Sequence, residues 1–130
     1  MTKERVFQKS YAAQLLRIAK ADLDAAQVLA KSRTIRPENI LFHVGQTIEK
    51  SLKAVLCKRG LAVPLTHDLN LILDRIPKDL IVPQGDTLDD LSQFATIRRY
   101  EEGEAIFHDE EISLAIDTAL KVLSWAEKTV

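Results

Sequence analysis

The sequence predicts an all-α protein, an antiparallel up-and-down bundle of four long helices plus one short helix. Its apolar residues recur at spacings of three and four, which is the period of a helix with one buried face. Aromatic residues make up only 5% of the 130 residues, and plentiful alanine and leucine favour helices over strands. Glycine and proline number four each, too few for most turn-rich β architectures. Because the length is close to that of one domain, we expect residues 1–130 to form a single helical domain.

Two long helices are expected in the first half of the chain. The first covers residues 4–32, and its buried face comprises Leu15, Ile18, Ala19, Ala25, Ala26 and Leu29. The second covers residues 37–60, because proline is favoured at the first helical position and glycine directly after a helix end. Its apolar stripe comprises Leu41, Val44, Ile48, Leu52, Val55 and Leu56. Gly45 lies on the same side, where it indicates that another helix passes close by.

The second half is expected to hold one short and two long helices. Thr66 is the predicted N-cap of the short helix, which carries Leu69 and Ile72 inward and stops before Pro77. After a turn at residues 83–86, a fourth helix has the inward residues Leu88, Leu91, Phe94 and Ala95. The fifth helix covers residues 109–128. Its inward residues are Ile112, Ala115, Ile116, Ala119, Leu123 and Ala126.

Several classes of protein are excluded by what the sequence lacks. Its single cysteine, Cys57, cannot form an intrachain disulfide and is expected to be a plain buried thiol in a cytoplasmic protein. No apolar run approaches the roughly 18 residues that span a bilayer, so we expect no membrane partner. The Glu-x-x-His pairs of a di-iron bundle are missing, as are Gly-rich phosphate loops and nucleophile motifs. We therefore expect no metal and no cofactor.

The charge is divided unevenly along the chain. Residues 1–65 hold 12 Lys and Arg against 5 Asp and Glu, a net charge of +7. Residues 66–130 hold 6 against 14, a net charge of −8. Such a division indicates either an anionic partner for the first half or two halves that pack against each other.

Two charged residues fall on stripes that should be apolar. Asp22 projects among the apolar residues of the first helix, and Arg98 lies beside Leu91 and Phe94 on the fourth. A lone buried charge costs several kcal/mol, so we expect these two to meet or to share a polar pocket lined by the second helix. The second helix supplies a polar stripe of its own. That stripe consists of His43, Gln46, Lys50 and Lys53.

Each of these residues also has a purely structural explanation. Arg98 lies in the last turn of its helix, where a cation interacts favourably with the helix dipole. His67 belongs to an ordinary helix start, with a capping residue before it and an acid after it. The polar stripe of the second helix is also what a solvated face would look like. If the groups instead converge on one groove, their lysine, arginine and histidine side chains suit phosphate.

Four segments of the sequence are distinctive in combination. They are residues 21–26 (ADLDAA), 42–54 (FHVGQTIEKSLKA), 66–69 (THDL) and 95–100 (ATIRRY). In this order they resemble the HEPN domain, the "higher eukaryote and prokaryote nucleotide-binding" domain. The resemblance spans residues 8–128. It implies a prokaryotic helical bundle that usually dimerises and is often encoded beside a small nucleotidyltransferase in a toxin–antitoxin-like pair. Many members of the family are ribonucleases, and their signature is an Arg followed after four to six residues by a His.

That ribonuclease signature is absent at the expected place. Nine residues separate Arg98 from His108, and eight separate Arg99 from it. Glu101, Glu102 and Glu104, in the acidic stretch 101–111, would also repel RNA phosphate locally. We therefore assign no catalytic residue and predict a dimeric binding module for a nucleotide or a nucleotidyltransferase.

In the predicted site, Asp22 orients the pocket while the basic groups meet phosphate. The nucleotide-binding candidates are His43, Lys50, Lys53, His67, Arg98 and Tyr100. One alternative is a metal-independent ribonuclease acting on RNA, in which His67 or His43 works with Arg98. Another is a purely structural subunit whose helices complete a bundle with a different chain.

Overall fold

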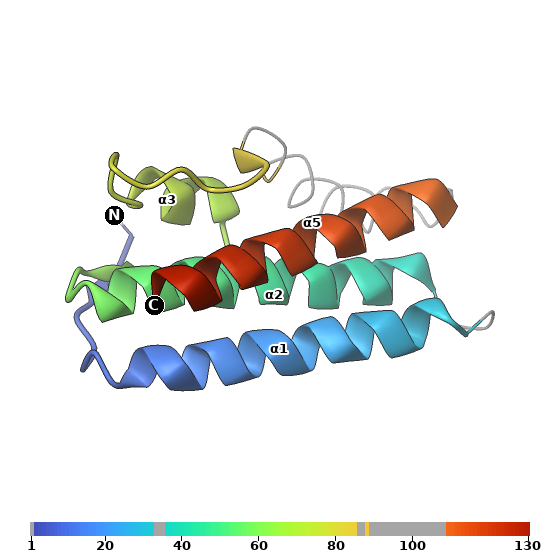
Figure 1. The fold of residues 1–130 in the computed structure, drawn as a ribbon, viewed down its shortest axis with the longest axis horizontal. Coiled ribbons are helices and arrows are strands. Elements are labelled where there is room, and N and C mark those ends of the chain that lie inside the picture. Colours follow the sequence, from blue (N-terminus) through green and yellow to red (C-terminus); the bar gives the residue numbers. More distant parts are fainter. Residues whose placement is uncertain (1, 33–35, 86–87, 89–108) are drawn as a thin grey trace.

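Three long helices lie side by side in the computed structural model of the chain, which describes residues 2–32, 36–85, 88 and 109–130. They are α1 (Tyr11–Ala30), α2 (Pro37–Lys58) and α5 (Asp109–Thr129). Helices α2 and α5 run in the same direction, and α1 runs opposite to both (Figure 1). The short helix α3 (Leu69–Asp74) lies near the C-terminal half of α2 (Figure 1). The predicted helical bundle is confirmed.

Helix α2 occupies the centre of this arrangement. It contacts α1, α5, α3 and the strand β2 (Val63–Pro64). Its entire predicted apolar stripe is buried. Because neighbours cover it from several sides, α2 also buries the polar residues Thr47, Glu49, Ser51 and Lys53. This helix therefore has no broad solvated face along its C-terminal half.

The N-terminal segment is the main difference from the predicted elements. Helix α1 begins at Tyr11, whereas residues 4–10 were expected to be helical. Instead β1 (Glu4–Arg5) pairs antiparallel with β2, with Glu4 opposite Pro64 and Arg5 opposite Val63. A two-residue strand is too short to show the alternating pattern by which strands are predicted. This pairing holds the segment that precedes His67 in sequence against the N-terminal segment of the chain.

The apolar face of α1 is narrower than predicted. Its buried residues are Ala12, Leu15, Ala19, Leu23 and Ala26. They follow successive steps of three, four, four and three residues, as in a helix packed along one seam. The predicted Ile18 lies beside this seam and is 41% exposed, while Leu23, which was not predicted, is buried.

Helix α5 follows its predicted face closely. Ile112, Ala115, Ala119, Leu123 and Ala126 are buried, and Ile116 is partly buried. Val122 and Thr118 join them, and the Thr118 hydroxyl donates to the Leu114 carbonyl 3.0 Å away. Of the predicted fourth helix, Leu88 is buried as expected. Leu91, Phe94, Ala95 and the acidic stretch up to residue 108 lie outside the described residues.

The ends of α2 and α3 are set by local hydrogen bonds. Gly60 has φ +71°; its N–H donates to the Cys57 carbonyl, and the Leu61 N–H donates to that of Leu56, both at 3.0 Å. This is the Schellman arrangement, which ends a helix at a left-handed glycine. For α3 the predicted cap is wrong: Asp68, not Thr66, accepts from the helix N–H groups. Thr66 accepts from the Asp68 N–H at 3.1 Å.

Among the described residues, the close helix expected at Gly45 is not found. A Cβ added at Gly45 would meet no atom of the described part of the chain within 4 Å, so none of these residues requires glycine there. Within the described ranges, no helix combines the length and the apolar character that crossing a membrane requires.

These two glycines give opposite predictions for substitution by alanine. Gly60→Ala should destabilise the protein by about 1–2 kcal/mol, because a left-handed backbone is costly for a residue with a Cβ. Gly45→Ala should stabilise it by about 0.5–1 kcal/mol, because alanine is the better residue inside a helix. Urea unfolding followed by circular dichroism measures both. Equal effects of the same sign would contradict the assignment of Gly60 as the helix end.

Candidate functional site

The carboxylate of Glu49 is the centre of a buried ionic cluster in the middle of α2. Its side chain is only 2% exposed. Lys53 Nζ donates to Oε2 over 3.0 Å and Lys50 Nζ donates to the same oxygen over 3.1 Å. His67 Nδ1 lies 2.9 Å from Oε1. Three of the predicted phosphate-binding residues are thus brought together by a residue that was not predicted.

Local structure explains how Lys53 and His67 reach the carboxylate. Lys53 lies one helical turn after Glu49, a spacing at which side chains on a helix meet. His67 comes from the segment between β2 and α3. The ladder with β1 holds one end of that segment, and on the other side Asp68 accepts hydrogen bonds from the Asn70 and Leu71 N–H groups. His67 is therefore held in place by the ladder that precedes it in the chain and by the Asp68 cap that follows it.

Electrostatics keep Glu49 ionised in this buried position. Burial by itself raises the pKa of Glu49, whereas the hydrogen bond from His67 and the charges of Lys53 and Lys50 lower it. The attractive contacts outweigh burial, so the pKa lies below its ordinary value of 4.5. An ionised carboxylate only accepts hydrogen bonds, so His67 Nδ1 must be the donor. The Nε2 atom is then left for other partners.

The cluster extends from the interior to the surface. The side chain of Lys53 is 10% exposed, that of Lys50 is 22% exposed and that of His67 is 82% exposed. Two ammonium groups face one carboxylate, so the cluster keeps an excess of positive charge even when His67 is neutral. An anion arriving from solvent would meet His67 and Lys50 first.

Asp22 and His43 form a separate pair between α1 and α2. His43 Nδ1 lies 2.8 Å from Asp22 Oδ1, and the two side chains are 30% and 18% exposed. Beside them the Thr47 hydroxyl donates to the carbonyls of Ala19 and His43. Among the described residues, Asp22 has the partner that its place on an apolar stripe requires, and that partner is His43. Arg98, the expected partner, and Tyr100 lie outside the described residues.

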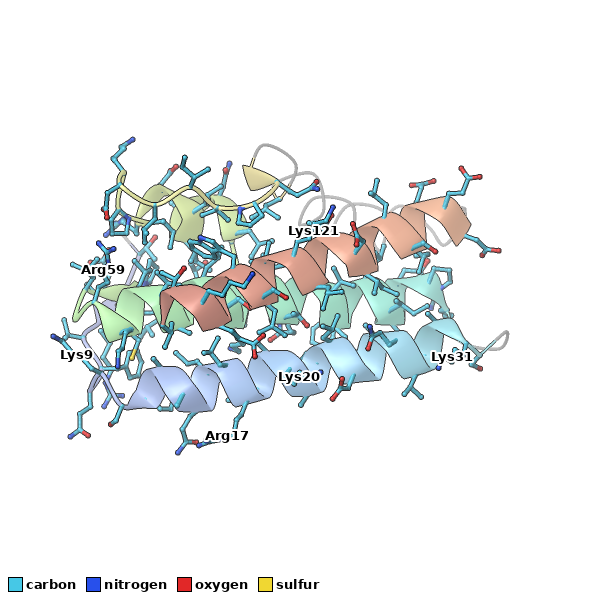
Figure 2. The ribbon with its side chains drawn as sticks, in the orientation of Figure 1. Lys9, Arg17, Lys20, Lys31, Arg59 and Lys121 are labelled. Atoms are coloured by element: carbon cyan, nitrogen blue, oxygen red, sulfur yellow. The ribbon has the colours of Figure 1, made fainter. Side chains whose placement is uncertain are left out.

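The described basic side chains of the first half differ in what they contact. Lys50 and Lys53 face Glu49, whereas Arg17 points away from α2 on the outer side of α1 (Figure 2). Lys9 and Lys31 lie near opposite ends of α1 (Figure 2). Arg59 pairs with Asp79 of the acidic second half at 3.1 Å. The Arg59–Asp79 pair thus offsets part of the charge difference between the two halves of the sequence. The cations of α1 remain exposed.

The remaining candidates for chemistry are few in the part of the chain that the structure describes. No three His, Cys, Asp or Glu side chains there are grouped so that they could hold a metal ion. Cys57 is buried, as predicted, and its thiol donates to the Gln8 carbonyl at 3.1 Å. Burial raises the pKa of this thiol, which disfavours the reactive thiolate.

The HEPN domain family matches the sequence over residues 12–129, which is most of the chain. The chain therefore belongs to the HEPN domain family. Its fold is similar to that in the crystal structure of TT1696 from Thermus thermophilus, with a TM-score of 0.77. The two are 23% identical, and the match covers 92% of this chain and 98% of the other. No curated protein matches the sequence.

Removing the charge of Glu49 should destabilise the fold in a pH-dependent way. Glu49→Gln is expected to cost about 3 kcal/mol at pH 7, because it leaves a mostly buried lysine without its counter-charge. Since the folded-state pKa of Glu49 is lowered, its contribution is present above pH 4.5 and is lost as the pH falls through the folded value. Urea unfolding of both proteins from pH 7 to below pH 4 should show the difference shrinking.

Asp117→Asn is the matched control for this experiment. Asp117 forms an exposed pair with Lys121 at i, i+4, with an N–O distance of 2.9 Å. Its loss should change the free energy of unfolding by no more than about 0.5 kcal/mol. If Glu49→Gln were equally mild at pH 7, the cluster would not stabilise the fold as described.

Proposed function

We propose that this HEPN chain is a binding module that holds the phosphate groups of a nucleotide at Lys50, Lys53 and His67. The observation that carries the proposal is the convergence of these three groups on the one buried carboxylate of Glu49. Positive side chains repel one another, and an internal carboxylate is what allows them to gather before a ligand arrives. In this proposal the whole of residues 1–130 acts as one helical unit.

The geometry supports contact between phosphate and the outer side of the cluster. The Glu49 side chain is enclosed, so a ligand meets the cations and not the carboxylate. Each lysine ammonium has three N–H donors, and the contact with Glu49 uses one of them. The remaining donors of Lys50 and the exposed imidazole of His67 can form charge-assisted bonds to phosphate oxygens. The Lys53 charge lies behind them and adds attraction.

Asp22 and His43 are proposed to extend the same site along α2. His43 precedes Lys50 by seven residues, which is about two helical turns or 10 Å along the axis. The 2.8 Å contact with Asp22 restricts the His43 ring, which supports the proposed orienting role of Asp22. Arg98 and Tyr100 remain proposed members of the remaining wall.

Partners are proposed from membership of the family. We propose a homodimer and association with a small nucleotidyltransferase in a toxin–antitoxin-like system. Light scattering of the purified protein measures the first, and co-purification with the product of a neighbouring gene tests the second. Stable association with such a product, in a chain that binds no nucleotide, would instead support a purely structural subunit.

A metal-independent ribonuclease is the second candidate function. The observation in its favour is the pairing of His67 with a buried carboxylate, which holds an imidazole with its other nitrogen available for proton transfer. Degradation of RNA by the purified protein, abolished in His67→Ala, would support this activity. Intact RNA after incubation with the wild type would favour the binding module.

Nucleotide binding is tested by calorimetric titration with ATP. Lys50→Ala and His67→Ala should each weaken binding about tenfold, since each removes a hydrogen bond to a charged phosphate. The control is Lys121→Ala on α5 (Figure 2), a lysine that pairs with Asp117 and should leave the affinity unchanged. A wild-type protein that binds no ATP at millimolar concentration would overturn the proposal.

A further inference from the structure

We propose that Phe42 is the platform on which the nucleobase stacks, so that a nucleoside polyphosphate lies along α2 with its phosphates at Lys50 and His67. This inference rests on the proposed function and adds the orientation and class of the ligand. Phe42 was not among the predicted site residues. Its side chain is 45% exposed although it is carried by the most covered helix of the fold.

The ring of Phe42 is supported on one side by a fixed neighbour. The rings of Phe42 and His43 lie edge to face, with centroids 5.4 Å apart and planes at 77°. Asp22 in turn holds the His43 ring through the 2.8 Å contact. Single exposed apolar residues are ordinary on protein surfaces. An exposed aromatic ring held by a hydrogen-bonded partner is a better stacking surface, because less side-chain motion is lost on binding.

Helix geometry aligns Phe42 with the ionic cluster. With successive residues about 100° apart, Gln46 lies about 40° and Lys53 about 20° around the axis from Phe42. Lys50 lies about 80° from Phe42 and about 12 Å further along the axis. The ring, an amide and the cations therefore follow one another along a single face of α2. Gln46 is partly exposed between the two ends.

This order of groups matches the order of groups in a nucleotide. An aromatic face accepts any nucleobase, since every base has a π-face. An amide can donate hydrogen bonds to ribose hydroxyls and accept hydrogen bonds from them. The lysines and His67 bind the anionic end of the nucleotide. A separation of about 12 Å is too long for an inorganic phosphate to contact both ends. It favours a nucleoside di- or triphosphate, with little discrimination among bases.

The test compares three probes by calorimetric titration: ATP, adenosine and inorganic tripolyphosphate. The wild type should bind ATP about tenfold more tightly than tripolyphosphate, because only ATP carries a base to stack. Phe42→Ala should remove that advantage and leave tripolyphosphate binding unchanged. Phe42→Leu should behave like the alanine variant, and Phe42→Trp should keep the advantage. Circular dichroism checks that each variant is folded, and Phe42→Leu keeps the apolar contacts if alanine does not fold.

Leu114→Ala is the matched control, because Leu114 is another exposed apolar side chain, 62% exposed on α5. Leu114→Ala should leave the affinities for ATP, adenosine and tripolyphosphate unchanged. Equal affinities for ATP and tripolyphosphate, both unaffected by Phe42→Ala, would overturn the stacking inference and leave the proposed phosphate site standing. Binding of neither compound by the wild type would overturn the proposed function and, with it, this inference.

Discussion

The buried carboxylate of Glu49 is the constraint on which the arrangement around α2 depends. An ionised group cannot leave water without partners, because its lost hydration costs several kcal/mol. Lys53, Lys50 and His67 supply those partners at 2.9 to 3.1 Å. Since His67 belongs to the segment between β2 and α3, satisfying Glu49 also fixes that segment on α2. The ladder with β1 then ties the N-terminus to the same place.

The three long helices that the structure describes, and most of their buried faces, could be predicted because helical periodicity is a local property of the sequence. The central position of α2 could not. Lys53 belongs to a polar stripe that resembles a solvated face when α2 is considered alone, and only the elements packed around α2 bury it together with Thr47, Glu49 and Ser51. The strand at Glu4–Arg5 was missed for a related reason, because its pairing with Val63–Pro64 joins residues nearly sixty positions apart. At the start of α3, Thr66 and Asp68 are both residues that can cap a helix, and Asp68, which is nearer the helix, forms the cap.

The candidate site was predicted in part. The charge of Asp22 on an apolar stripe correctly indicated a polar partner, and the expected pocket lined by the second helix included His43. A helical projection shows faces and not which helices are neighbours, so it did not single out His43 over Arg98. Lys50, Lys53 and His67 were selected for their own chemistry. Glu49 was missed because a glutamate four residues before a lysine is typical of an exposed pair on a helix. The contact with His67, eighteen residues away, depends on tertiary structure and leaves no local signal.

An internal carboxylate has two opposing effects on an anion site. It lowers the positive potential that a phosphate group meets, which weakens attraction at a distance. It also holds the lysines and the imidazole in place, so that less conformational entropy is lost when a ligand binds. Glu49 is enclosed, so distance and solvent weaken its effect on the potential at the surface. His67 is exposed but still hydrogen-bonded to Glu49, so it keeps the full benefit of being held in place. For a ligand with several negative charges, long-range attraction is strong even after this reduction. A preorganised cluster of modest net charge is therefore better suited to reversible binding of a polyphosphate than to tight capture of a single anion.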